Sequence, residues 1–300
     1  MASRTLKLAL TQHACADDAR SNLATAVEMI RDAAGQGAEL VVTQELFAGP
    51  YFPIVEDDGA FDRAEPIPGP TTRRLADLAK ELRVSISASL FERRAPGLYH
   101  NTSVLLNAKG ELVGKYRKMH IPDDPSYYEK YYFTPGDLGF DAHAVEAPAG
   151  EAKVGMLVCW DQWFPEAARL TAMHGAEVLL YPTAIGWHED EPAGERSAQR
   201  DAWTTIQQSH AIANGLFVAA ANRIGTEGTS TFWGSSFVAD PMGRVIAQAS
   251  EDQPEVLLAE LDLSLVEHYR RNWCLFFRDR RIDAYGPISQ RWLDRPSATP

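Results

Sequence analysis

Residues 154–166 read Val-Gly-Met-Leu-Val-Cys-Trp-Asp-Gln-Trp-Phe-Pro-Glu, an apolar run that ends at a cysteine and a polar break. The apolar run predicts a buried strand, and Pro165 predicts the first turn of a helix, where its missing N–H group would have no partner anyway. A strand, a sharp turn and a helix in this order are typical of α/β proteins. The order places Cys159 at the tip of a sheet, where a substrate can reach it.

Cys159 has two interpretations from this pattern. It is a nucleophile if the helix start stabilises a thiolate or an oxyanion through its N–H groups and its positive dipole end. It is a small buried hydrophobic residue if it behaves like most free cysteines. The local pattern leaves both interpretations open.

Two other predicted strands end in charged residues. The apolar run at 40–43 leads to Glu45, and the segment at 111–118 ends in a cluster of cations that includes Lys118. Each residue alone is more often a solvated surface charge. Together with Cys159 they form an ordered Glu, Lys and Cys set at strand ends, where α/β proteins assemble their sites.

The chain resembles the nitrilase superfamily of carbon–nitrogen hydrolases from about Leu6 to about Trp292. The stretches that carry the resemblance are 43–45, 115–120, 128–137, 159–166, 181–186, 215–223 and 278–286. The coarse pattern of strands and helices favours an α/β fold but does not choose between one sheet and two. The resemblance implies a four-layer αββα sandwich that forms a homodimer or a larger homo-oligomer.

The chemistry of thiols explains why these residue types occur together. An isolated thiol with a pKa of about 8.5 is only a few per cent thiolate at neutral pH, so it needs a base or a cationic neighbour. Glu45 fits the base, and Lys118 can stabilise the anion. The Lys118 ammonium and the Trp160 N–H group are the expected donors to a tetrahedral oxyanion. The resemblance adds Glu129 as a second catalytic carboxylate that holds Lys118 or the departing nitrogen. Without the resemblance, we would interpret Glu129 as a charged residue on the surface of a helix.

Three loop segments, at 49–53, 122–132 and 184–191, combine carboxylates with aromatic side chains. This combination suits an alkylammonium group through ion pairing and cation–π attraction, although each acid can also be a solvated loop charge. We therefore expect a small cationic ureido substrate. The predicted substrate-binding residues are Trp160, Tyr51, Asp124, Trp163 and Ala184.

The preferred substrate is N-carbamoylputrescine, which hydrolysis would convert to putrescine, carbon dioxide and ammonia in polyamine biosynthesis from agmatine. The alternative is an anionic ureido compound such as N-carbamoyl-β-alanine or an N-carbamoyl amino acid. That substrate would call for an arginine, and Arg223 is a candidate unless it forms a structural ion pair. A catalytically silent binding module is the remote alternative, because every expected catalytic position is filled by the required residue type.

Composition limits the remaining possibilities. The chain has 300 residues, of which 45% are hydrophobic, and a net charge of −12, which argues against nucleic-acid binding. It has no apolar run of the roughly 20 residues that cross a membrane. No nucleotide-binding glycine motif occurs, so no cofactor is expected. The absence of a linker predicts one domain at 1–294, followed by a flexible tail at 295–300.

The three cysteines are Cys15, Cys159 and Cys274, an odd number without the spacing of metal ligands. This usage predicts no metal site and a reduced, cytoplasmic protein. Cys274 is interpreted as a packing residue. We expect helices at 22–34, 71–83, 165–174 and 198–214, and strands at 5–11, 39–43, 84–91, 99–107, 111–118, 177–181, 216–222, 232–239, 243–248 and 256–261.

Overall fold

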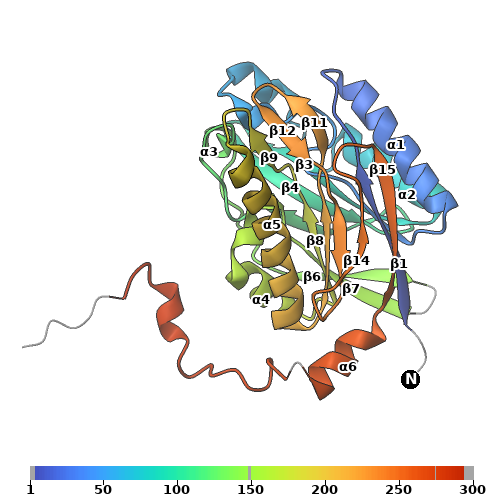
Figure 1. Ribbon diagram of the computed structural model, residues 1–300. Coiled ribbons are helices and arrows are strands. Elements are labelled where there is room, and N and C mark those ends of the chain that lie inside the picture. Colours follow the sequence, from blue (N-terminus) through green and yellow to red (C-terminus); the bar gives the residue numbers. More distant parts are fainter. Residues whose placement is uncertain (1–3, 148–149, 274, 294–300) are drawn as a thin grey trace, which may run out of the picture.

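The computed structural model describes residues 4–147, 150–273 and 275–293, and two six-stranded sheets lie face to face at its centre (Figure 1). The first sheet has the order β15-β1-β2-β3-β4-β5 and the second has the order β14-β13-β10-β8-β7-β6. The strands of the first sheet are β1 (Thr5–Gln12), β2 (Leu40–Val42), β3 (Ser85–Ala95), β4 (Leu98–Leu106), β5 (Leu112–Arg117) and β15 (Glu255–Asp262). Those of the second are β6 (Ala142–Ala147), β7 (Gly150–Met156), β8 (Val178–Pro182), β10 (Phe217–Ala221), β13 (Phe237–Ala239) and β14 (Val245–Gln248).

Helices cover the outer faces of both sheets. The first sheet carries α1 (Ala19–Gly35) and α2 (Pro70–Leu82), and the second carries α4 (Pro165–Met173) and α5 (Ala193–Asn214). The remaining helical elements are α3 (Glu129–Tyr132) and α6 (Ser264–Asn272), with 3-10 turns η1 (Phe52–Ile54), η2 (Asp58–Arg63), η3 (Cys159–Trp163) and η4 (Gly286–Ser289). The predicted four-layer αββα sandwich is confirmed. Among the described residues, no helix is both long and apolar enough to cross a bilayer.

The alternation of side chains along β1 explains how one strand serves two cores. Leu8 and Leu10 point into the core between the sheets, whereas Ala9 points toward the core beneath α1 and α2. Successive residues of a strand face opposite sides of a sheet, so an uninterrupted apolar strand can be buried on both faces. Ile30 of α1 and Leu78 of α2 fill the outer core with Ala9.

The strand predicted at 232–239 is wrong as one element. It is divided between β12 (Ser230–Trp233) and β13, which belong to different sheets. Gly234 and Ser235 lie between them with φ of 52° and 56°. Two consecutive residues in the left-handed region cannot continue a strand, so the chain turns from one sheet into the other. With β9 (Gly186–His188) and β11 (Ile224–Glu227), β12 forms a small three-stranded sheet that the sequence did not predict.

The strand β6, its pairing with β7 and the helix α6 were also absent from the sequence-based expectations, whereas the strand that leads to Cys159 was predicted. In β6 only Val145 is buried, so this edge strand lacks the alternating pattern that identifies a strand. Beyond α6, residues 275–293 extend from the body as an arm (Figure 1). Cys274 and the tail at 295–300 lie outside the described residues.

Candidate active site

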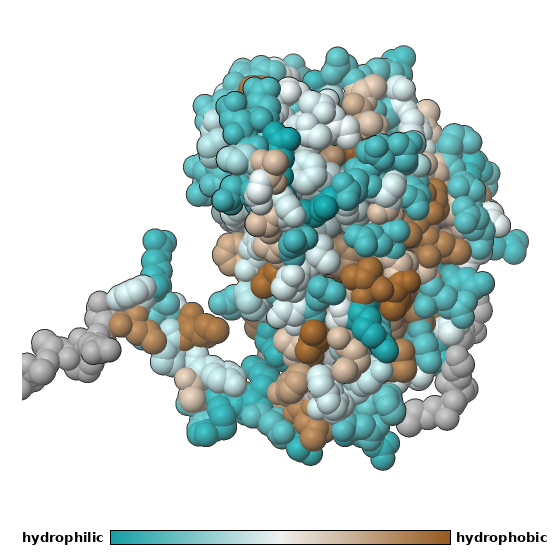
Figure 2. All heavy atoms as spheres, viewed as in Figure 1, coloured by the Kyte–Doolittle hydropathy of each residue, from teal (hydrophilic) through white to brown (hydrophobic). Residues whose placement is uncertain are grey.

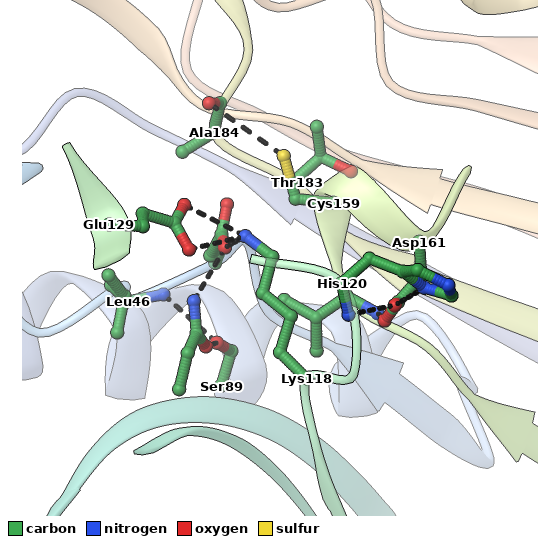
Figure 3. Close-up of polar contacts among 12 residues, drawn as sticks. Leu46, Ser89, Lys118, His120, Glu129, Cys159, Asp161, Thr183 and Ala184 are labelled. Atoms are coloured by element: carbon green, nitrogen blue, oxygen red, sulfur yellow. Dashed lines mark hydrogen bonds and ion pairs between the residues drawn. The ribbon is translucent and has the colours of Figure 1, made fainter. Parts of the chain in front are cut away.

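The four predicted catalytic residues come together near the ends of strands from both sheets, and Figure 3 labels three of them, Lys118, Glu129 and Cys159. Glu45 follows β2, Lys118 follows β5, Cys159 follows β7, and Glu129 begins α3. The Lys118 Nζ atom lies 2.9 Å from Glu45 Oε1, and 2.8 and 2.7 Å from the two Glu129 oxygens. The side chains of Lys118 and both glutamates are fully buried. The structure therefore brings together residues that are separated by up to 114 positions in the sequence, from 45 to 159.

The Lys118 ammonium is held in its charged form by the two carboxylates. Burial favours the neutral amine, but the charges of Glu129 and Glu45 more than offset this, so the pKa of Lys118 is raised. Glu129 behaves differently. Burial raises the pKa of its carboxyl to about 7, against the lowering effect of Lys118 and with a further increase from Glu45. Near neutral pH, Glu129 therefore exchanges a proton while Lys118 keeps its own.

Glu45 is fixed through one of its two oxygens. Its Oε1 atom accepts hydrogen bonds from Lys118 Nζ and from Asn101 Nδ2, the latter at 2.7 Å. Its Oε2 atom is buried and has no hydrogen-bond partner among the described residues. A rigidly held carboxylate with one unpartnered oxygen is suited to accept a proton from a nearby donor.

Cys159 is the first residue of the 3-10 turn η3 and has a strained backbone conformation. Its φ of 39° lies in the left-handed region, which residues with a Cβ atom rarely adopt. The Sγ atom lies 4.0 Å from the carbonyl oxygen of Ala184, which follows β8. Burial and the charge of Glu45 raise the pKa of the thiol well above its usual value, although Lys118 opposes this. The resting side chain is therefore a thiol.

This arrangement changes one part of the sequence-based reasoning. One interpretation of the sequence was that the start of a helix stabilises a thiolate; α4 begins at Pro165 as predicted, but Cys159 is the first residue of the five-residue 3-10 turn η3 that precedes it. The charged groups that act on the Cys159 thiol include the Glu45 carboxylate and the Lys118 ammonium.

The predicted substrate-binding residues have different surroundings. Tyr51 is buried and donates its hydroxyl hydrogen to Glu129 Oε1, so it orders the second carboxylate. Trp160 and Trp163 are half-buried and form an edge-on pair beside Cys159. Ala184 provides the carbonyl that faces Sγ, and Asp124 is exposed on the surface.

Asn101 and Tyr127 belong to the site but were not predicted. The Asn101 side chain donates a hydrogen bond to Glu45. The backbone carbonyl oxygen of Asn101 accepts the backbone N–H of Lys118 at 2.9 Å, so one residue of β4 positions both catalytic residues. The Tyr127 hydroxyl bonds to both backbone groups of Gly186. A polar run at 100–103 within an otherwise apolar strand was the available signal for Asn101, because a buried polar residue needs a partner.

Arg223 is buried, and its contacts are all within the protein. Its guanidinium donates to the carbonyl oxygens of Glu45 and Leu46 at 2.7 and 3.2 Å, and it pairs with Glu227 at 2.8 Å. Glu227 in turn accepts the N–H of Tyr51. Arg223 is therefore a structural cation that ties the Glu45 loop to the Tyr51 loop.

No group of three or more His, Cys, Asp or Glu side chains in the described ranges could hold a metal ion. The geometry is that of a cysteine-dependent hydrolase, with a thiol, a carboxylate base and an ammonium in one buried site. The chain belongs to the family described as carbon-nitrogen hydrolase, whose sequence model matches residues 7–271, and its fold and motifs are those of the nitrilase superfamily. It is therefore an enzyme that cleaves carbon–nitrogen bonds.

The similar proteins include enzymes that act on ureido groups. The chain is 45% identical to the N-carbamoylputrescine amidase of Solanum lycopersicum, with 94% of each chain covered. It is 40% identical to the citrullinase of Francisella tularensis, over 96% of this chain and 99% of that one.

Solved structures agree with this assignment. A carbon–nitrogen hydrolase from Helicobacter pylori superposes with a TM-score of 0.92 at 43% identity, covering 96% of this chain and 100% of that one. An amidase variant from Nesterenkonia sp. has a TM-score of 0.77 at 26% identity, with 97% and 98% covered. In that protein the active-site cysteine carries the covalently added acetamide moiety of fluoroacetamide.

Proposed function

We propose that this enzyme hydrolyses N-carbamoylputrescine to putrescine, carbon dioxide and ammonia, with Cys159 as nucleophile and Glu45 as base. The observation that carries the catalytic assignment is the contact of the Lys118 ammonium with both carboxylates beside the buried thiol. The names of the relatives that are N-carbamoylputrescine amidases support the substrate. The reaction would form putrescine as a step in polyamine biosynthesis.

The first half of the proposed cycle forms a covalent intermediate. Glu45 takes the thiol proton while Sγ attacks the carbamoyl carbon, and the carbonyl oxygen becomes an oxyanion. Trp160 N–H and Lys118 Nζ stabilise that oxygen. All three donor directions of Nζ point to carboxylates in the free enzyme, so one bond to Glu129 must lengthen when the oxyanion forms. Collapse breaks the bond to the terminal nitrogen, which leaves as ammonia with the proton from Glu45.

The second half of the cycle releases the product. Glu45 removes a proton from water, and the oxygen attacks the S-carbamoyl carbon. The bond between carbon and Sγ breaks, and the sulfur recovers its proton from Glu45. The product is a carbamic acid that loses carbon dioxide and leaves the amine. Ionised Glu129 holds Lys118 in place throughout, so the cycle needs Glu129 without its proton.

Glu191 is the residue we assign to the ammonium end of the substrate. Its Oε1 atom accepts a hydrogen bond from Gln199 at 3.0 Å, and its Oε2 atom is buried without a partner among the described residues. Burial is the main cause that raises the pKa of the Tyr127 hydroxyl, and the charge of Glu191 adds to it, so Glu191 acts on a residue of the site. An unpartnered carboxylate oxygen near the site suits a cationic group.

Arg223 argues against the anionic alternative. Its two terminal nitrogens, Nη1 and Nη2, donate to Glu227, Glu45 and Leu46, whereas Nε has no partner among the described residues, and the residue is fully buried. A substrate carboxylate would have to displace a structural ion pair to reach it. This cost disfavours N-carbamoyl-β-alanine as substrate.

Ammonia release from N-carbamoylputrescine, citrulline and N-carbamoyl-β-alanine, measured side by side, tests the substrate. We expect the highest kcat/KM for N-carbamoylputrescine. Glu191→Gln should raise its KM about 10–100-fold, because a charge-assisted hydrogen bond contributes about 1.5–3 kcal/mol. The exposed neighbour Glu189 provides the control Glu189→Gln, which should leave KM unchanged. A higher kcat/KM for either of the other two substrates would refute the substrate assignment.

We also propose that the chain is a single domain at 1–294 that forms a cytoplasmic homo-oligomer through its C-terminal arm. Apolar side chains of the arm are open to solvent in one chain (Figure 2), notably Ile282, Ile288 and Trp292, which are 73%, 69% and 80% exposed. A second copy is the occupant that would cover them, because the arm extends away from its own body. Light scattering should find a dimer or larger species, and Ile282→Asp with Ile288→Asp should reduce it to monomers. Val55→Asp, which changes an exposed apolar residue of the body, should not.

A further inference from the structure

Asp161 is a fully buried carboxylate that takes no part in the proposed chemistry but lies two residues beyond Cys159 (Figure 3). Its Oδ2 atom accepts hydrogen bonds from the Val158 N–H at 2.9 Å and from the Tyr116 hydroxyl at 2.8 Å. Its Oδ1 atom accepts from the His120 N–H at 3.1 Å and lies 2.7 Å from His120 Nδ1. Four donors around one carboxylate offset the cost of burying its charge.

Two of these contacts close a ring around the nucleophile. The Asp161 side chain accepts the Val158 N–H, and the Asp161 N–H donates to the Val158 carbonyl oxygen at 3.0 Å. Cys159 lies inside this ring with its φ of 39°. A left-handed residue with a Cβ atom costs of order 1–3 kcal/mol and persists only where its surroundings over-determine it. The reciprocal bonds of Asp161 and Val158 provide that constraint.

The other contacts reach the segment that carries Lys118. Tyr116 and His120 lie two residues on either side of Lys118, and the Tyr116 hydroxyl also accepts the Met119 N–H at 3.3 Å. His120 is further fixed by stacking on Phe164, with ring centroids 3.8 Å apart. Tyr116 lies in β5 of the first sheet, and η3 follows β7 of the second. Asp161 thus joins the two sheets at the point where each delivers a catalytic residue.

We propose that Asp161 is a positioning residue that holds Cys159 in its left-handed conformation and fixes its distance from Lys118. The inference rests on the proposed role of Cys159 as nucleophile. An asparagine at this position keeps the shape but replaces one oxygen with an NH2 group. Two of the four donors would then face the new NH2 group, which is itself a donor. Their hydrogen bonds would break, and either the ring around Cys159 or the link to the Lys118 segment would open.

The test compares Asp161→Asn with a control in another buried aspartate. We expect kcat to fall about 100-fold, the usual effect of a displacement near 1 Å, with KM within about threefold of the wild type. The rate at which iodoacetamide alkylates Cys159 should also fall in Asp161→Asn. Asp240 is also buried and accepts the N–H groups of Met242 and Arg244, but it lies in the β13–β14 turn. Asp240→Asn should lower Tm while kcat and the alkylation rate stay at wild-type values.

A kcat or an alkylation rate within about threefold of the wild type in Asp161→Asn would overturn the proposal, as would an equal loss in Asp240→Asn. Alkylation needs no substrate, so it reports on Asp161 even if the substrate assignment fails. If Asp161→Asn does not fold, Tyr116→Phe tests the same link from the Lys118 side. Its kcat should then fall about tenfold at unchanged KM, and a kcat within about twofold of the wild type would overturn the proposal.

Discussion

Removing the ammonium of Lys118 should change stability in a way that depends on pH. Lys118→Met keeps the length of the side chain but leaves Glu45 and Glu129 buried together without their cation. Breaking a buried ion pair by removing one partner costs about 3–5 kcal/mol, because the remaining charge is uncompensated. For 300 residues this corresponds to a fall in Tm of about 6 °C, since the unfolding entropy is about 2 cal/mol/K per residue.

The sign of the pH effect follows from the pKa of the carboxyls. In the wild type, the pKa of Glu129 in the folded state is already raised to about 7, through burial and despite Lys118. Without Lys118 it rises further, while in the unfolded chain it returns to its usual value. A carboxyl with a raised folded pKa destabilises the fold above that pKa, and this penalty disappears as the pH falls. The loss in free energy of unfolding of the variant, relative to the wild type, should therefore be about 1–2 kcal/mol smaller at pH 5.5 than at pH 8.

Thermal unfolding of both proteins at pH 8 and pH 5.5 measures this difference. The control is Lys115→Met, because Lys115 is partly exposed and pairs with Glu92, which keeps two hydrogen bonds from Arg117. Although burial acts against it, Arg117 and Thr102 lower the pKa of Glu92 to about 2, so this carboxyl does not titrate in the range. For Lys115→Met we expect a loss in free energy of unfolding below about 1 kcal/mol at both pH values. A stability loss in Lys118→Met that is the same at both pH values, or larger at pH 5.5, would refute the reasoning.

The remaining predictions concern activity. Cys159→Ala should abolish ammonia release with Tm within about 2 °C of the wild type, because the residue is small and few contacts are lost; measurable turnover would remove the nucleophile assignment. Glu45→Gln keeps its hydrogen bond from Asn101 but cannot accept a proton, so kcat should fall by at least about 100-fold, and a near-normal kcat would exclude the base role. In the wild type, kcat should fall as the pH drops through about 7, where Glu129 takes up a proton. Tyr51→Phe removes a hydrogen bond that lowers this pKa, so the acid side of the pH profile should move to higher pH, and a shift in the other direction would contradict the contact.

The sequence predicted the parts of the fold and site that depend on local pattern. The apolar runs before Glu45 and Cys159 and the predicted strand at 111–118 identified three strand ends, and the four-layer sandwich followed from resemblance to the superfamily. Residues that reach the site through long-range packing were not predicted in these roles. Arg223 contacts the carbonyl of a residue 178 positions away, and the sequence allowed it equally to bind a substrate carboxylate.

Tyr51 also has a contact that its local sequence did not predict. Its place in a loop rich in aromatic residues predicted contact with substrate; the hydrogen bond from its hydroxyl to Glu129 was not predicted. The partner of a hydroxyl group depends on how α3 packs against η1, and local sequence does not specify that packing. The division at Gly234 and Ser235 was missed because apolar residues continue on both sides of the turn.

Mass spectrometry of the enzyme quenched in acid during turnover of N-carbamoylputrescine tests most directly whether Cys159 forms the covalent intermediate. We predict an adduct equal in mass to the substrate less ammonia, located on the peptide that contains Cys159. The peptide that contains Cys15, the other described free cysteine, should remain unmodified, and the Cys159→Ala protein should carry no adduct. Turnover at the normal rate with no adduct under rapid quenching, or an adduct on Cys15 alone, would contradict the account.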